Sequence, residues 1–271
     1  MRLIFYLVIS FLFLSTLGFS SHISFVINVA GGSIHENKTK FNIEILNIGD
    51  EPAFKIVVEP LTNFNHTRIF SDHLDPKNYL EGSIFINTTS GLKRGSYLIP
   101  ILVKYSDSNG YSFSVITEGV MVNVYNIRGN VWAFPQSIHI EEKASKKLSI
   151  KVMNEDNKPH SVTIKIFHPL EIEIDPNILN ISLRPSDSKD VDFKVTNLGG
   201  LYGSTYNYIV SIEYEDELSH YLRYTTGKIV VGYKNRDMFV IGFVTLIIIQ
   251  VFLLVYLKII YRSKWRRRRY R

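Results

Sequence analysis

The sequence has 271 residues, 45% of them hydrophobic, and is therefore long enough for two ordinary domains that each bury a core. Nine of the 31 Lys and Arg lie at the two ends, so residues 21 to 237 hold 22 basic against 25 acidic residues, a net charge of −3 that argues against nucleic-acid binding. The absence of cysteine excludes disulfides, thiol catalysis and zinc–thiolate sites.

The N-terminal residues 1–20, MRLIFYLVISFLFLSTLGFS, have the layout of a secretory signal peptide. Arg2 supplies the positive charge, and an apolar run extends from Leu3 to Leu14. Gly18 and Ser20 place small side chains where cleavage after Ser20 requires them. An uncleaved N-terminal anchor is the alternative interpretation.

Residues 21–127 read as short strands separated by turns. Phe41, Ile43 and Ile45 alternate with polar residues, the pattern of a strand with one face in a core. Asp107-Ser-Asn-Gly110 resembles part of a calcium loop, but the twelve-residue pattern with its final Glu is missing, so a hairpin turn is favoured. Asp72-His73-Leu74-Asp75 offers metal ligands, yet a solvated loop is the favoured interpretation.

A repeat divides the exported part of the chain. KFNIEILNIGDEP at residues 40–52 recurs as KLSIKVMNEDNKP at residues 147–159, and GSYLIPILVKYSD at 95–107 resembles GSTYNYIVSIEYED at 203–216. The offset stays near 108 residues, which two tandem copies of one domain explain. The first repeated segment, at 40–52 and 147–159, is predicted to form the same strand and hairpin turn in each copy. We therefore predict domains at 21–127 and 128–233.

The second copy repeats the strand pattern. Its clearest strand predicts a row of core residues, namely Tyr206, Tyr208, Val210, Ile212 and Tyr214. The residues between them are predicted to face water, namely Asn207, Ser211, Glu213 and Glu215.

Two groups of residues in the second copy are candidates for a functional site. Glu171, Glu173 and Asp175 share one face of a predicted strand and could hold calcium or act as acid and base, but the wet side of a sheet is the simpler interpretation. Trp132 and Phe134 lie where the copies join. Packing of a first strand or of the joint is favoured over a glycan-stacking platform.

These patterns predict an all-β fold of two tandem immunoglobulin-like antiparallel β-sandwiches, followed by one C-terminal transmembrane α-helix. LNIGDEPAFKIVVEP, followed by LKRGSYLIPILVKYSDSNG, resembles the CARDB-like cell-surface domains of bacteria and archaea. The second copy is similar to NEW3-type sandwich domains. A weaker similarity is to the beta subunit of the translocon-associated complex, which has a single sandwich. The resemblance implies a spacer or binding module.

Residues 238–257, MFVIGFVTLIIIQVFLLVYL, carry no charge and match the length needed to cross a bilayer core of about 30 Å. A linker at 234–237 precedes this predicted span. Gln250 lies near its middle, and because a polar amide in hydrocarbon favours a hydrogen-bonding neighbour, we expect Gln250 to face a partner helix.

The tail at 258–271 is strongly basic and orients the span with its C-terminus in the cytoplasm. It could anchor the span, bind anionic lipid head groups or act as a receptor-read sorting signal. Its membrane-surface residues are Lys258, Arg262, Lys264, Trp265, Arg266, Arg267, Arg268, Arg269 and Arg271.

Four glycosylation sequons fall in the segment predicted to be exported, at Asn37, Asn65, Asn87 and Asn180. We expect no cofactor and no metal. No motif of a hydrolase, zinc protease or nucleotide-binding loop is present in the sequence.

The sequence therefore predicts a non-enzymatic, single-pass protein of the cell membrane, with its ectodomain outside or lumenal. Its partners would be the lipid bilayer and another envelope protein or a glycan. The alternative is an accessory subunit of a membrane-embedded secretion, glycosylation or transport complex.

Overall fold

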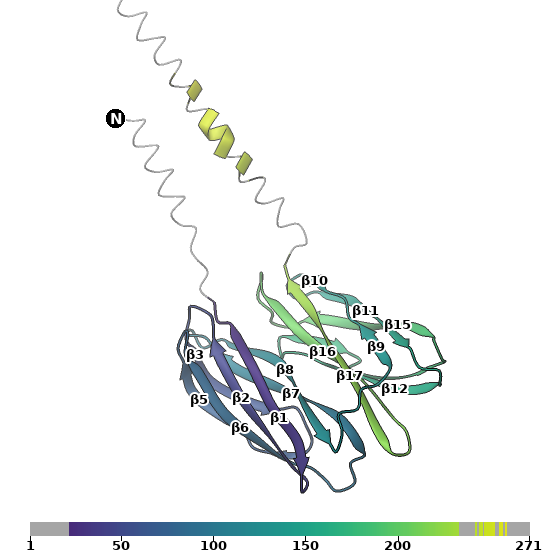
Figure 1. Ribbon diagram of the computed structural model, residues 1–271. Helices are drawn as coiled ribbons and strands as arrows, with labels where there is room; N and C mark the ends of the chain where they lie inside the picture. The colour runs from purple at the N-terminus through teal and green to yellow at the C-terminus, as the bar shows by residue number, and fades with distance from the viewer. Residues whose placement is uncertain are drawn as a thin grey trace, which may run out of the picture. The chain divides into compact units, whose positions relative to one another are not determined.

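The computed structural model describes residues 22–232 and part of a helical stretch between 242 and 258 (Figure 1). The described residues 22–231 belong to one compact unit, and a second unit begins at Gly232. The predicted signal peptide at 1–20, the linker at 234–237 and the tail beyond Lys258 lie outside the described residues, as does part of the predicted span. Within the described residues, no helix is long and apolar enough to cross a membrane.

The first half of the β region, residues 22–127, is built from two layers of strands. One layer has the order β1-β2-β6-β4, and β5-β3-β7-β8 form the other, with antiparallel pairing inside each layer. The strands are β1 (Phe25–His35), β2 (Lys38–Asn47), β3 (Ala53–Pro60), β4 (Asn65–His66), β5 (Ile69–Leu74), β6 (Tyr79–Asn87), β7 (Arg94–Ser106) and β8 (Ser112–Asn123).

The second half, residues 128–232, repeats this plan. One layer is β13-β15-β11-β9 and the other is β14-β12-β16-β17, with β10 added in parallel to β17. Pairing of β11 with β15 repeats that of β2 with β6. The strands are β9 (Val131–Phe134), β10 (Ile138–Ile140), β11 (Ser145–Asn154), β12 (His160–Phe167), β13 (Ile172–Asp175), β14 (Ile178–Leu183), β15 (Ser188–Asn197), β16 (Thr205–Glu215) and β17 (Ser219–Val231).

The prediction of an all-β fold with antiparallel sandwich layers is confirmed. The predicted domain boundary between residues 127 and 128 stays a prediction, because both halves belong to one compact unit. A short parallel pairing of β17 with β7 even joins sheets of the two halves into one thirteen-stranded sheet.

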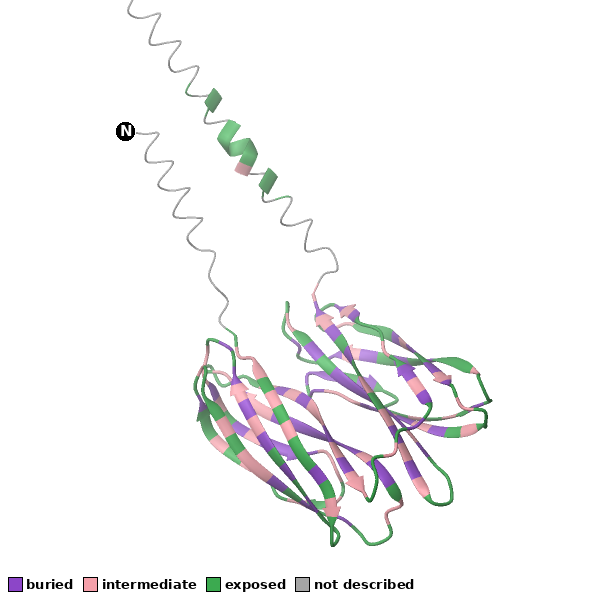
Figure 2. Ribbon diagram, in the orientation of Figure 1, coloured by how far each residue is buried: buried purple, intermediate pink, exposed green. Residues whose placement is uncertain are grey.

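Each half has its own apolar core, and the alternation in the sequence locates it correctly. Buried and exposed residues alternate along strands of both halves (Figure 2). Phe41, Ile43 and Ile45 of β2 are buried, as are Leu148, Ile150 and Val152 of β11. Burial of each such side chain stabilises the fold by about 1.5–3 kcal/mol. The five residues of β16 predicted to face the core are also buried.

The first repeated segment, at 40–52 and 147–159, contains one buried asparagine in each copy. In the first half, the Asn47 amide group donates to the carbonyl oxygens of Glu51 and Leu74, and its side-chain oxygen accepts from the Gly49 N–H. In the second half, Asn154 makes the same three bonds, to Lys158, Arg184 and Asp156. Each asparagine therefore closes its own turn and ties that turn to a distant loop.

One prediction for β16 is wrong. Ser211 was expected to face water, but it is completely buried, and Ile209 on the same face is buried too. The reason is that this face of β16 is covered by the first half of the chain. Asn207 and Glu215 are exposed, as predicted.

Candidate functional site

A backbone pairing, an apolar cluster and several polar side chains lie where the two halves meet, and we call this region the inter-half contact. Its backbone part is the parallel pairing of β17 with β7, in which Ser219 aligns with Arg94 and His220 with Gly95. Gly95 has φ +141°, and a Cβ there would lie 1.9 Å from the His220 carbonyl oxygen. Only glycine allows the two backbones to approach this closely.

An apolar cluster separate from the two cores fills the inter-half contact. Leu98, Leu102 and Ile116 come from β7 and β8, and Ile209 and Leu222 come from β16 and β17. All five are at most 8% exposed. These four strands are therefore covered on both faces. Simple alternation of apolar and polar residues instead predicts strands with one face in solvent.

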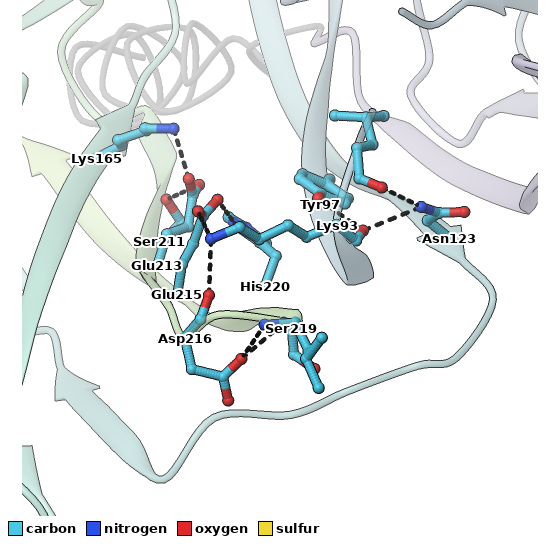
Figure 3. Close-up of polar contacts among 12 residues, drawn as sticks. Lys93, Tyr97, Asn123, Lys165, Ser211, Glu213, Glu215, Asp216, Ser219 and His220 are labelled. Carbon is cyan, nitrogen blue, oxygen red and sulfur yellow. Dashed lines mark hydrogen bonds and ion pairs between the residues drawn. The ribbon is translucent and has the colours of Figure 1, made fainter. Parts of the chain in front are cut away.

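A polar cluster borders this apolar part (Figure 3). The Lys93 ammonium lies 2.7 Å from the Glu215 carboxylate and donates to the Asp216 carbonyl oxygen at 2.7 Å. The Tyr97 ring stacks on the His220 imidazole, with 4.2 Å between their centroids. His220 Nδ1 is 3.0 Å from Glu215 Oε1. Residues from both halves thus converge on one carboxylate.

A second carboxylate, that of Glu213, lies two residues before Glu215 on β16. Lys165 of β12 pairs with Glu213, and the Ser211 hydroxyl donates to Glu213 Oε1 at 3.0 Å. The buried Ser211 therefore has a partner within its own strand. Its burial is consistent with the rule that buried hydroxyl groups are hydrogen-bonded.

The protonation states favour a structural role for the cluster. The Lys93 and His220 hydrogen bonds lower the pKa of Glu215, whose charged form they stabilise. Burial, together with the negative charge of Glu215, raises the pKa of Tyr97 to about 12. At neutral pH the cluster therefore holds an ionised carboxylate and a neutral phenol, which suits charge-assisted pairing between the halves.

Glu171 forms a separate polar connection between the halves. It was predicted to lie on the wet side of a strand, but it is buried, and its carboxylate accepts from both the Ser114 N–H and the Ser114 hydroxyl. The same hydroxyl accepts from the Leu170 N–H at 2.8 Å. The predicted row is broken because Glu171 precedes β13, whereas Glu173 and Asp175 lie on that strand and are exposed.

The other clusters named from the sequence are not brought together into sites. Asp107 closes the turn between β7 and β8 by accepting from the N–H groups of Asn109 and Tyr111, as the hairpin prediction requires. His73 and Asp75 lie 3.9 Å apart on the surface. No group of three His, Cys, Asp or Glu side chains suited to a metal ion occurs in the described part of the chain.

Trp132 and Phe134 lie on β9, the first strand of the second half. The Arg223 guanidinium covers the Trp132 ring at 3.8 Å, and Phe134 is 46% exposed. Strand packing, which the sequence favoured over a glycan platform, therefore describes Trp132, whereas Phe134 points outward.

Three of the four sequons meet at one end of β6. Asn65 pairs with Asn87 across β4 and β6, and the Asn37 carbonyl oxygen accepts from the Thr88 N–H. Asn180 lies in β14, where its side chain accepts from the Thr163 hydroxyl. All four asparagines are exposed, so none is sterically excluded from carrying a glycan.

Gln250 lies in the helical residues 247–252 and is exposed, so its predicted partner helix stays a prediction. Of the tail residues, only Lys258 is described, and it is exposed. Sequence reasoning missed Lys93, Gly95, Tyr97, Ser114 and His220. The only signal was the second repeated segment, in which Gly95 and Tyr97 lie, and by itself it indicates only the tandem repeat.

No family model and no curated protein matches the chain. Similar solved structures include Escherichia coli α2-macroglobulin, at 8% identity over 76% of this chain and 17% of that one, with a TM-score of 0.31. A Porphyromonas gingivalis W83 protein of unknown function is 11% identical over 75% of this chain and 99% of that one, with a TM-score of 0.33. The seventh PapD-like domain of human CEP192 is 9% identical over 40% of this chain and 89% of that domain, with a TM-score of 0.29. The chain spans 17% of the length of the bacterial α2-macroglobulin, and likenesses at these TM-scores carry no argument about function.

Proposed function

We propose that the chain is a non-enzymatic, single-pass membrane protein whose β region acts as a rigid binding or spacer module for another envelope protein or a glycan. In this proposal a signal peptide directs export, residues 238–257 span the bilayer, and the basic tail stays in the cytoplasm. The ectodomain faces the cell surface or an equivalent lumen.

The inter-half contact is the observation that carries the proposal. Two sandwich-like halves joined by a flexible linker would reorient freely, whereas these share a backbone pairing, an apolar cluster and a buried carboxylate. A rigid spacer needs this coupling, because it must hold its distal half at a fixed distance and direction. The resemblance to CARDB-like and NEW3-type surface domains supports the same role.

The exposed sequons support the exported location that the proposal requires. Their asparagines lie on both halves of the β region, at one end of β6 and on β14. A glycan on these surfaces would leave the inter-half contact untouched.

Purification of the full-length protein from its native membrane in mild detergent tests the proposal. We expect the protein to extract only with detergent, and its binding partner to be retained by a released fragment of residues 22–233. Recovery in the soluble fraction after alkaline washing would overturn the membrane anchor.

Stoichiometric membrane partners that are lost in Gln250→Leu would instead favour the accessory-subunit alternative. Thr245→Leu is the matched control, since it also removes a polar group from the apolar run.

A further inference from the structure

The loop between β15 and β16, residues 198–204, presents apolar side chains to solvent, and we call it the apolar loop. Its sequence, LGGLYGS, carries no charge. Leu198, Leu201 and Tyr202 are each between 50% and 57% exposed. Leu170 is 57% exposed and adjoins the loop, because the Leu198 N–H donates to the Glu171 carbonyl oxygen. Four large apolar side chains gathered on one rim indicate a surface with a partner.

Hydrogen bonds hold the apolar loop in a defined shape. The buried Asn197 side chain accepts from the Gly200 N–H at 2.6 Å and donates to the Gly200 carbonyl oxygen. The Tyr206 hydroxyl accepts from the Leu201 N–H at 3.0 Å. Because the backbone is satisfied internally, the leucine side chains are displayed by a fixed scaffold.

The loop is bonded to the last residue of the β region. The Gly203 N–H donates to the Val231 carbonyl oxygen at 2.7 Å, and the Val231 N–H donates to Ser204 at 2.9 Å. Only six residues, 232–237, separate Val231 from the apolar run that begins at Met238. The seven steps of chain from Val231 to Met238 span at most about 25 Å, so a membrane entered at Met238 would lie within that distance of Val231, to which the loop is bonded.

We propose that the apolar loop rests in the head-group layer of the bilayer that anchors the chain, with Leu198, Leu201 and Tyr202 as its interfacial residues. This inference rests on the membrane anchor of the proposed function. Tyrosine suits such a layer, about 6 Å deep, because it combines an apolar ring with a polar hydroxyl, and the two leucines add apolar area.

The attraction is apolar rather than electrostatic. The neighbouring turn carries the exposed Glu141 and Glu142 beside Lys143, and the Glu141 carbonyl oxygen accepts from the Asn197 amide. Because this turn carries both acidic and basic side chains, it should not bind anionic head groups better than neutral ones. We therefore expect contact with neutral phosphatidylcholine that changes little with salt.

The opposite end of the second half provides a matched control. Leu218 is 76% exposed in the turn between β16 and β17 and is flanked by Asp216 and Glu217. The thirteen residues of β17 place this turn about 40 Å from Val231. Leu218 is more exposed than Leu201 but should never meet the bilayer.

The chain has no cysteine, so single labels can be introduced without background. Leu201→Cys and Leu218→Cys, each labelled with an environment-sensitive fluorophore in the full-length protein, are reconstituted into phosphatidylcholine vesicles. The expected result is a blue-shifted emission at position 201, quenched at least twofold more by lipids spin-labelled near the head group than at position 218. Circular dichroism confirms that both variants keep the β fold.

Three results would overturn the proposal. Equal quenching at both positions in protein that floats with the vesicles rejects the loop contact while leaving the anchor intact. Protein that does not float rejects the anchor itself. A blue shift at position 201 without lipid quenching rejects the lipid contact and assigns the loop to a second copy of the chain.

Discussion

Gly95 in the first half and Gly203 in the second half are equivalent residues of the repeat, near the starts of β7 and β16, but their surroundings differ completely. Both have positive φ, +141° and +86°. A Cβ on Gly95 would collide with the His220 backbone, whereas a Cβ on Gly203 would meet nothing within 4 Å. The same residue is thus kept at one position for close approach and at the other for a turn.

The two buried asparagines show the opposite behaviour. Asn47 and Asn154 make matching hydrogen bonds, because each side chain closes a turn and ties it to a loop within its own half. Features that fold a half are therefore repeated, and features that join the halves are not.

The largest effect is expected at the two glycines. Gly95→Ala forces the paired backbones apart and should lower the free energy of unfolding by about 3–5 kcal/mol, whereas Gly203→Ala should cost about 1 kcal/mol of backbone strain. Denaturant unfolding of the full-length protein in mild detergent measures both. Similar losses for the two variants would contradict a specific role of Gly95 in the contact.

The asparagines should respond alike. Asn47→Ala and Asn154→Ala each remove three hydrogen bonds made by a buried side chain, and each should cost about 2–4 kcal/mol. The exposed turn residue Asn157 is the control, and Asn157→Ala should stay within about 0.5 kcal/mol of the natural protein. A large difference between the two buried positions would show that the halves depend on this turn unequally.

The inter-half contact offers a smaller effect. Ser114→Ala removes one hydrogen bond to the buried Glu171 carboxylate and should cost about 2 kcal/mol. Ser112→Ala, on the exposed start of the same strand, should change little. Limited proteolysis provides a second readout, since loosening the contact should expose the residues between β8 and β9 to cleavage before either half unfolds.

The smallest effect is a pH dependence. The pKa of Glu215 is lowered in the folded protein, so the folded state binds fewer protons than the unfolded state as this group titrates. The stabilisation is fully present above the ordinary value of 4.5 and is lost as pH falls through the folded pKa. Because the Lys93–Glu215 pair is partly exposed, it contributes less than about 1 kcal/mol. Thermal melts between pH 3 and 6 should show this loss, and Lys93→Met should reduce it.

The sequence predicted the repeated strands well because each half buries one face of each strand, and that burial produces the alternation seen around Ile43 and Ile150. It failed at Ser211 and Glu171, where the covering surface comes from more than 50 residues away. Polar residues that become buried only through such contacts resemble solvent-facing residues in any local window. Only their partners, Ser114 for Glu171 and the first half of the chain for Ser211, distinguish them.

The long pairing of β16 with β17 has a mechanical consequence. Eleven residue pairs, from Thr205 with Val230 to Glu215 with His220, hold β17 along its length. A pull on the chain beyond Gly232 would load β17 along its own axis, while the antiparallel hydrogen bonds lie across that axis. Such bonds share a shearing force and must fail together, instead of opening one after another like a zipper. The strand at which the chain leaves the β region is therefore the one best placed to bear tension.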